Sequence, residues 1–189
     1  DNNSVDRSIE MIKEEFPEVI LIANKKNIGF AKANNQAIKQ AIGKYILLLN
    51  PDTIIQENTL IDTVSFFNKN KSAGGLGVKM IDGRGVFLPE SKRSFPSPSI
   101  AFYKIFGLSK IFPKSKKFGR YHLNYLNENK ISEIDVISGA FLMTRKKIID
   151  KIGMLDETFF MYGEDIDFSY RIQKAGYKNF YFPKTSIIH

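Results

Sequence analysis

A short polar motif, Asn50-Pro51-Asp52, directly follows the apolar run Tyr45–Leu49. An acidic side chain at the carboxyl end of a buried strand points towards the crevice where α/β sheets bind their ligands. A carboxylate oxygen is the ligand that a hard divalent cation prefers, and the amide oxygen of Asn50 can add to it. The motif therefore predicts a cation site at Asp52, while its residue types are equally typical of a simple turn.

A second polar motif, Gly163-Glu164-Asp165-Ile166-Asp167, opens a predicted helix over residues 163–176. Acids in a first turn stabilise a helix through its dipole, which is the structural explanation for this group. The helical spacing indicates more, because Asp165 falls on the apolar face, whereas Glu164 and Asp167 share the polar face with Arg171. A partly desolvated carboxylate is a better base near neutral pH, so we expect Asp165 to act as one.

A third motif, Asn27-Ile28-Gly29-Phe30 with Asn34, forms a polar turn into a predicted helix N-terminus, which suits an anion or a nucleotide. Neither a P-loop nor a GxGxxG sequence is present. The two histidines, His122 and His189, are too few to argue for a Ser-His-Asp arrangement. The chain has no cysteine, which excludes thiolate nucleophiles and Cys-ligated zinc and fits a reducing compartment.

The elements that must position these motifs alternate between helical and strand patterns in the first half of the chain. Helical spacing predicts helices at 4–16, 29–43 and 57–68, and short apolar runs predict strands at 19–23, 45–49 and 76–80. Such alternation is typical of crossover units around a mixed, mainly parallel sheet. We therefore expect an α/β, Rossmann-like fold whose ligands bind at the carboxyl ends of the strands.

The composition is that of a folded domain with one unusual segment. The chain has 189 residues, 43% of them hydrophobic, and a net charge of +8. No apolar run reaches the roughly 18 residues that a membrane-spanning helix needs. Nine basic residues and one acid lie in the segment 92–130, so this segment carries the whole net charge. Because aromatic residues alternate with its basic ones, it suits an anionic membrane surface, or nucleic acid, or a solvated insertion held to the core by its rings.

Taken in order, the motifs resemble inverting family 2 glycosyltransferases of the GT-A fold, especially the rhamnosyltransferase-like branch. The matching stretches are DNNSVD (1–6), NIGFAKANNQAI (27–38), YILLLNPDT (45–53), ISGAFLMTRK (137–146), IGMLDETFFMYGEDIDFSYRIQKAGY (152–177) and the closing His189. They cover nearly the whole chain except the basic segment 92–130.

The resemblance implies a donor-binding role for six positions, of which Asp52 also binds the metal. Asp1 matches the acid that contacts the nucleotide base. Asn27, Gly29 and Asn34 fall in the stretch that lines the nucleotide pocket. Arg171 falls where the family often has a basic residue near the diphosphate or the acceptor.

The resemblance also implies the catalytic and metal-binding residues. Asp52 matches the metal-binding acid of the DxD-type motif, in which Asn50 stands at the first acid's position, and His189 matches a histidine that completes the metal site in some members. Asp165 matches the general base, with Glu164 beside it. A Mg²⁺ or Mn²⁺ ion is the implied cofactor.

The implied function is transfer of a sugar, such as rhamnose from its deoxythymidine diphosphate, to a polysaccharide or lipid-linked acceptor with inversion. We expect a cytoplasmic protein, peripheral on the inner face of the cell membrane through segment 92–130, with nucleic acid as the weaker alternative. Two other functions stay open: a sugar nucleotidyltransferase, and a non-catalytic nucleotide- or carbohydrate-binding domain.

The expected organisation is one catalytic domain over residues 1–189. Its nucleotide-binding half is 1–91, its basic aromatic insertion 92–130, and its acceptor half 131–189. Because the chain begins with Asp rather than Met, and because the family has a strand before Asp1 and continues beyond His189, we expect a fragment of a longer protein.

Overall fold

The computed structural model describes residues 1–112 and 114–189, without the side chains of Ala101, Lys104 and Lys110. Pro113 and the side chains of two lysines of the basic segment, Lys104 and Lys110, therefore lie outside what is described. The described residues form a six-stranded sheet in the order β1-β5-β3-β6-β2, with β4 beside β6. The strands are β1 (Tyr45–Leu49), β2 (Ile54–Ile55), β3 (Ala73–Ile81), β4 (Ser132–Ile134), β5 (Phe141–Arg145) and β6 (Lys178–Ile188).

The sheet is mixed, as the sequence predicts. Strands β1, β3 and β6 share one direction, so their carboxyl ends meet at one edge. Strand β5 runs against β1 and β3 and lies between them. Among residues 1–112 and 114–189, only the pair of β3 with β6 is parallel and the other four pairs are antiparallel, so the sheet is mixed but not mainly parallel as predicted.

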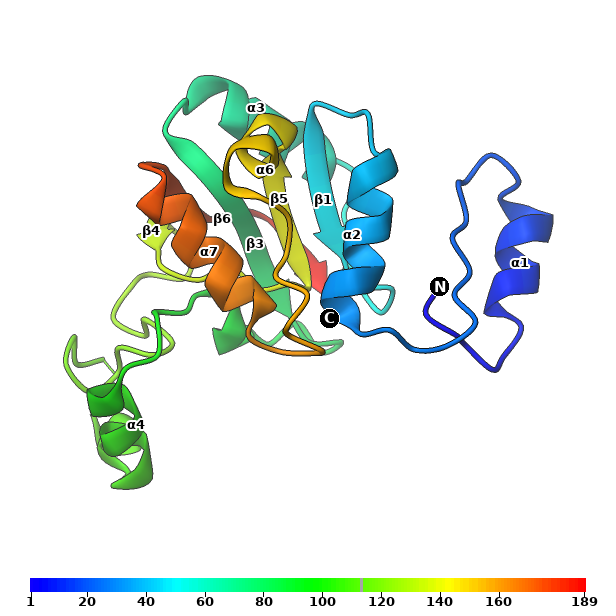
Figure 1. Cartoon of the computed structure of the whole chain (residues 1–189). Coiled ribbons are helices and arrows are strands. Elements are labelled where there is room, and N and C mark those ends of the chain that lie inside the picture. The colour runs from blue at the N-terminus through cyan, green and yellow to red at the C-terminus, as the bar shows by residue number, and fades with distance from the viewer. Residues whose placement is uncertain (113) are drawn as a thin grey trace.

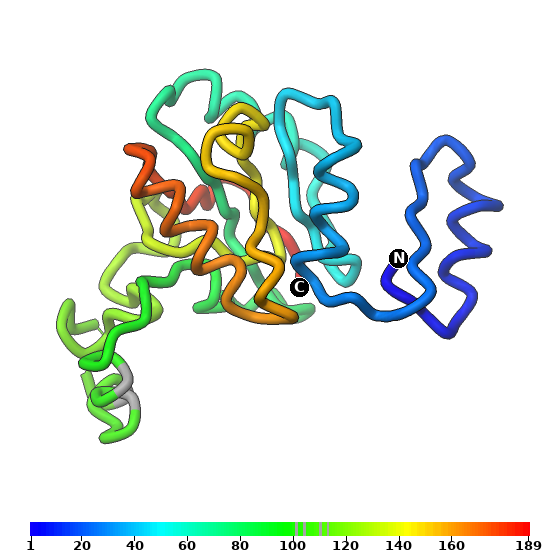
Figure 2. Tube along the Cα trace, in the orientation of Figure 1, coloured from blue at the N-terminus to red at the C-terminus, as the bar shows by residue number. Residues whose placement is uncertain are grey.

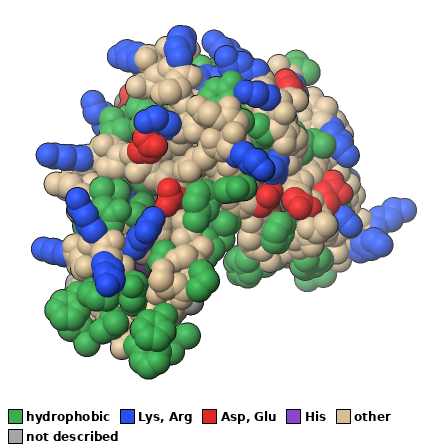
Figure 3. Space-filling view, turned by 60° about the vertical axis from the view of Figure 1, so that its left-hand side comes forward, with side chains coloured by type: hydrophobic (Ala, Val, Ile, Leu, Met, Phe, Trp, Pro, Cys, Tyr) green, Lys and Arg blue, Asp and Glu red, His purple; other side chains and the backbone are tan. Residues whose placement is uncertain are grey.

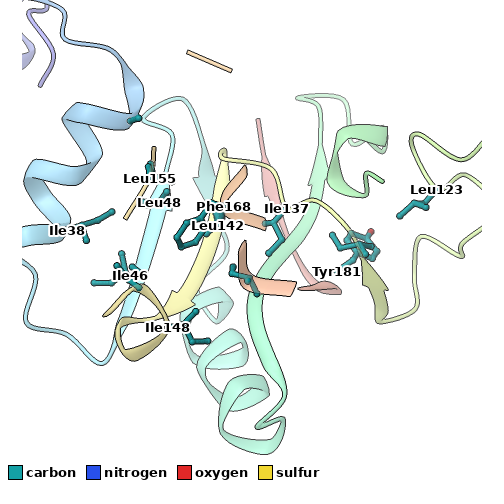
Figure 4. Close-up of a cluster of buried hydrophobic side chains, with 14 residues drawn as sticks. Ile38, Ile46, Leu48, Leu123, Ile137, Leu142, Ile148, Leu155, Phe168 and Tyr181 are labelled. Carbon is teal, nitrogen blue, oxygen red and sulfur yellow. The ribbon is translucent and has the colours of Figure 1, made fainter. Parts of the chain in front are cut away.

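Helices cover both faces of the sheet because its strands are apolar on both sides. Helices α2 (Phe30–Gln40), α6 (Lys146–Ile152) and α7 (Glu164–Lys174) lie on one face, and α3 (Thr59–Lys69) lies on the other (Figure 1). Alternate residues of β5 show this, since Leu142 belongs to the core under α2, α6 and α7, whereas Phe141 and Met143 pack with Phe67 of α3. Figure 4 shows the first of these cores, with Leu142 beside Phe168 of α7.

The N-terminal region differs from the sequence prediction in two ways. Helix α1 (Ser8–Glu15) begins four residues after Ser4, because Asp6 accepts hydrogen bonds from the amide and hydroxyl of Ser8. The strand predicted at 19–23 is wrong: this stretch is irregular, and no described strand lies beside it to complete a ladder. Helix α1 has no buried residue and lies apart from the sheet (Figure 1).

The basic segment forms a lobe that projects from the body of the molecule (Figures 1 and 2). It contains α4 (Pro98–Ile105) and α5 (Leu108–Ile111) and follows the short helix η1 (Pro89–Ser91). At its root Arg93 pairs with Val136, and the amide of Ser94 donates to the carbonyl of Tyr121. None of the described helices is long and apolar enough to cross a bilayer.

Candidate functional site

A cavity of about 550 Å³ lies where the carboxyl ends of β1, β3 and β6 meet. Asn50 follows β1, Met80 lies near the end of β3, and His189 follows β6, and all three line the cavity. The sequence placed the ligand crevice at this edge of the sheet. The remaining lining comes from the first residue of α2, the η1 region, the loop before β5, and the start of α7 with its preceding loop. These residues are Phe30, Leu88, Glu90, Arg93, Ser138, Gly139, Ala140, Met161, Tyr162, Glu164 and Asp165.

Asp165 reaches the cavity from the first turn of α7, and its side chain is only 14% exposed. The guanidinium of Arg93 donates a hydrogen bond to Oδ2 of Asp165 and forms an ion pair with it. The same guanidinium nitrogen donates to the carbonyl of Ile137 at 3.3 Å, and the amide of Gly139 lies 3.4 Å from Oδ2. These contacts hold the carboxylate in a defined position at the edge of the cavity.

Arg93 is the residue of this site that the sequence analysis missed. In the sequence, Arg93 is one of the nine basic residues of segment 92–130. Nothing in its local pattern distinguishes it, because its partner Asp165 lies 72 residues away in the chain. Its Nε is buried and has no hydrogen-bond partner among the described residues. One N–H donor of the guanidinium group is therefore unused by them.

Glu164 lies beside Asp165 and also lines the cavity. Helical spacing groups Glu164 with Asp167 and Arg171, and the structure adds that Glu164 is buried, with only 6% of the residue exposed. Its Oε2 has no partner among the described residues. Burial raises the pKa of the Glu164 carboxyl, and the neighbouring Asp165 raises it further, whereas Arg93 opposes the rise.

Asp52 and His189 meet at the rim of the cavity. Oδ1 of Asp52 is 3.6 Å from Nε2 of His189, and Nδ2 of Asn50 is 3.4 Å from the same nitrogen. The amide of His189 donates to the carbonyl of Ile81, which fixes the end of β6 beside β3. Across residues 1–112 and 114–189, no three acidic or histidine side chains cluster as a complete metal cage. One carboxylate and one imidazole fit a Mg²⁺ or Mn²⁺ ion that takes its other ligands from water and a diphosphate.

The N-terminal polar residues are brought together by Asn2. The Nδ2 of Asn2 donates to Oδ1 of Asn27 at 2.8 Å, and the amide of Ile28 donates to Oδ1 of Asn2 at 3.0 Å. The carboxylate of Asp1 accepts hydrogen bonds from the amides of Asn3 and Ser4. Asp1 and Asn27 therefore shape neighbouring turns, and Asn2, which the sequence analysis did not single out, joins them.

Gly29 and Asn34 act on the geometry of α2 and do not line the cavity. Gly29 has a φ of +88°, and a Cβ there would lie 2.6 Å from the carbonyl oxygen of Phe160. Only glycine fits this close approach without strain, and it allows the amide of Phe30 to donate to that carbonyl. Asn34 donates to the carbonyl of Phe30 within the helix at 2.9 Å. Phe30 is thereby held against the cavity.

The structure does not bring Arg171 to the cavity. Its Nε donates to Oδ2 of Asp167 at 2.8 Å, the i,i+4 pair that the sequence predicts. Its other nitrogens donate to the carbonyls of Ile152, Gly153 and Met154. Arg171 therefore ties α7 to the loop that follows α6, and most of its donors are used there.

Comparison with known proteins identifies the family. The family model described as "Glycosyl transferase family 2" matches residues 1–153. The chain belongs to this family. One family 2 relative, the N-acetylglucosaminyl-diphospho-decaprenol L-rhamnosyltransferase of Mycobacterium tuberculosis, is 24% identical over 203 residues, which cover 100% of this chain and 64% of that protein. Rhamnosyltransferase WbbL of Escherichia coli (strain K12) is 27% identical over 171 residues, which cover 85% of this chain and 60% of that protein.

The architecture agrees with the family. The crystal structure of GalNAc-T7 with UDP, GalNAc and Mn²⁺ matches with a TM-score of 0.68 and 14% identity, over 100% of this chain and 36% of that one. The fold is thus that of the GT-A glycosyltransferases, as the sequence predicts. This family 2 chain spans 64% and 60% of the length of the two rhamnosyltransferase relatives that it matches.

Proposed function

We propose that this family 2 chain is the catalytic domain of a glycosyltransferase that moves a sugar from a nucleoside diphosphate to an acceptor hydroxyl with inversion. The observation that carries the proposal is the cavity lined by both Asp165 and His189, with Asp52 beside His189. This arrangement supports a proposal in which the base and the diphosphate-binding edge share one cavity. Residues 1–91 would supply most of the donor site, 131–189 the base and the acceptor side, and 92–130 the insertion between them.

The proposed reaction is one displacement at the anomeric carbon. Asp165 accepts the proton of the acceptor hydroxyl while the hydroxyl oxygen forms a bond to the anomeric carbon. The bond from that carbon to the diphosphate oxygen breaks, and the electron pair leaves with the diphosphate. Attack from the side opposite the leaving group inverts the anomeric configuration, so no covalent sugar–enzyme intermediate is required.

Asp52 and His189 are the residues proposed to hold a Mg²⁺ or Mn²⁺ ion, with Asn50 beside them. When bound, such an ion supplies positive charge that stabilises the leaving diphosphate. The structural relative with UDP and Mn²⁺ supports this proposal. We propose that the residues implied for the nucleotide act by stabilising the local backbone. Asp1, Asn27 and Gly29 do so in turns, and Asn34 does so within α2. For Arg171 we propose a structural role in place of donor binding.

The names of two relatives support a more specific donor and acceptor. Both are rhamnosyltransferases, and one of them is named for a diphospho-decaprenol acceptor. We therefore propose a nucleoside diphosphate of rhamnose as the donor and a glycan carried on a lipid diphosphate as the acceptor. Such an acceptor would be met at the inner face of the cell membrane, where the protein would be peripheral.

A thermal-shift panel tests the donor site. The chain is measured with UDP, GDP and dTDP, each with and without Mn²⁺, beside two variants. Asp52→Asn removes the proposed ligand, and Asp150→Asn neutralises a 62% exposed acid of α6 outside the cavity as a matched control. We expect a Mn²⁺-dependent rise in Tm with one nucleotide that is lost in Asp52→Asn and kept in Asp150→Asn.

The panel has two outcomes that contradict the proposal. If the Tm shift is the same with and without Mn²⁺, both in the wild type and in Asp52→Asn, the proposed metal site at Asp52 is excluded. No shift with any nucleotide would exclude a nucleotide-sugar donor. Nucleotide binding combined with no sugar transfer to a lipid diphosphate glycan would favour a binding domain.

A further inference from the structure

The outer end of the lobe carries a group of exposed apolar side chains, which we call the apolar tip. Its members come from α4, α5 and the residues that follow each helix, and they are 51% to 80% exposed: Phe102, Ile105, Phe106, Ile111 and Phe112. Figure 3 shows hydrophobic side chains gathered at the end of this lobe. A contiguous apolar group of this kind on a soluble domain is typical of a contact with a partner or a membrane.

The tip is exposed although the lobe has packed aromatic residues of its own. The ring centroids of Phe102 and Phe106 are 4.3 Å apart, and those of Tyr103 and Phe118 are 4.9 Å apart. These ring contacts stabilise the lobe from within, yet they leave Ile105 and Phe106 largely in water. The apolar tip is therefore a surface of a structured lobe.

The charges around the tip are all of one sign. No acid occurs between Glu90 and Glu128 in the sequence. The described basic side chains Lys114, Lys116, Lys117 and Arg120 are exposed on the same lobe. In Figure 3, Lys and Arg side chains lie between the hydrophobic end of the lobe and the body. Apolar side chains at the end and cations behind them match the order of acyl chains and anionic headgroups in a bilayer.

The root of the lobe is fixed to the body beside the cavity. The amide of Val136 donates to the carbonyl of Arg93 at 3.0 Å, and the guanidinium of Arg93 donates to the carbonyl of Ile137 at 3.3 Å. Arg93 also lines the cavity and contacts Asp165. A surface that binds the tip therefore holds the cavity at a set position relative to that surface.

We propose that the apolar tip inserts into the interface of an anionic phospholipid bilayer while Lys114, Lys116 and Lys117 contact the headgroups. Two aliphatic side chains, Ile105 and Ile111, favour a bilayer over a nucleic acid, since bases would need aromatic faces to stack upon. The proposal deepens the peripheral location proposed above by naming the surface that docks. It requires no nucleotide and no transfer, so it can fail or stand independently of the proposed activity.

Vesicle flotation tests the proposal with phosphatidylcholine vesicles and with vesicles that contain about 30 mol% phosphatidylglycerol at physiological ionic strength. Four double variants of the chain are compared. The tip variant is Ile105→Ser/Phe106→Ser, and its control is Leu60→Ser/Ile61→Ser on α3, where both side chains are also exposed. The charge variant is Lys116→Glu/Lys117→Glu, and its control is Lys25→Glu/Lys26→Glu, a second exposed pair.

We expect the wild type and both controls to bind the anionic vesicles and to leave the neutral ones largely unbound. The tip variant should lower the partition coefficient at least about tenfold, because two apolar side chains no longer enter the interface. The charge variant should lower it at least about 25-fold, since each cation near an anionic surface contributes about fivefold. Equal circular dichroism and Tm values for each variant and its control show that folding is unchanged. If the tip variant fails to fold, the proposal is tested with the charge variant alone.

Three outcomes would overturn the proposal. The first is no binding of the wild type to anionic vesicles. The second is equal binding of the tip variant and the wild type. The third is self-association, or binding to single-stranded nucleic acid, that is lost in the tip variant while vesicle binding is kept, which would assign the surface to a second copy or to a nucleic acid.

Discussion

Arg93, at the root of the projecting lobe, forms an ion pair with Asp165, at the start of α7, and both side chains are about 15% exposed. The pair connects the insertion directly to the proposed base. Because the guanidinium contacts Oδ2 and the carbonyl of Ile137 together, it fixes how the carboxylate faces the cavity. Arg93 is thus a positioning residue for Asp165 under the proposed mechanism.

Substituting Arg93 should affect turnover more than donor binding. For Arg93→Met we expect kcat to fall about 100-fold, because a small displacement of a catalytic group has effects of this size, while KM for the donor stays within about threefold. Arg93→Lys should recover part of kcat, because it keeps the positive charge. Recovery should be incomplete, because lysine lacks the planar guanidinium group. Steady-state kinetics measure both constants, with Arg84→Met as the control at a side chain that is 86% exposed. An unchanged kcat in Arg93→Met would contradict the positioning role.

Removing the charge of Asp165 should stop the proposed reaction. Asp165→Asn cannot accept the acceptor proton, so we expect kcat to fall by about 10²- to 10⁴-fold. Nucleotide affinity, measured by the thermal shift with Mn²⁺, should stay unchanged. Asp167→Asn serves as the control on the same helix, because Asp167 contacts Arg171 and does not line the cavity. Near-normal turnover of Asp165→Asn would exclude Asp165 as the base.

Substituting Arg171 should lower stability and spare nucleotide binding. Arg171→Met loses the pair with Asp167 and the bonds to three consecutive carbonyls, so the free energy of unfolding should fall by about 2–3 kcal/mol. Urea unfolding measures this fall, and Lys174→Met on the same helix is the control with an exposed side chain. If folded Arg171→Met instead lost the nucleotide-induced shift at unchanged stability, the donor-binding role that the family resemblance implies would be restored.

Glu164 should make stability fall as pH rises. Its pKa is raised in the folded protein above the ordinary value of 4.5, so the folded state binds more protons than the unfolded state between these two values. The stabilisation is complete below the unfolded pKa and is lost as pH rises through the folded pKa. We expect Glu164→Gln to remove this loss, which urea unfolding across the pH range measures. Glu57→Gln, at an exposed acid, should keep the wild-type slope; the same slope in Glu164→Gln would contradict the assignment.

The sequence alone determined the elements whose signal is local. Strand β1 occupies the predicted residues, α2 begins directly after Gly29, and α7 begins at the predicted acids, because apolar runs and helical spacing act within a few residues. The order of the motifs also determined the family and the fold. The irregular stretch at 19–23 shows the limit of this reasoning, since an apolar run becomes a strand only when another strand pairs with it.

Only the tertiary structure decided which residues share the cavity. Sequence spacing grouped Glu164 with Asp167 and Arg171 and gave Arg93 no individual role, yet Glu164 and Arg93 both line the cavity with Asp165. Arg171, by contrast, binds the carbonyls of the loop that follows α6 and does not line the cavity. The reason is physical: the pairing of Arg93 with Asp165 depends on contacts between segments far apart in the chain, such as the bridge from Arg93 to Val136, and no local pattern records them.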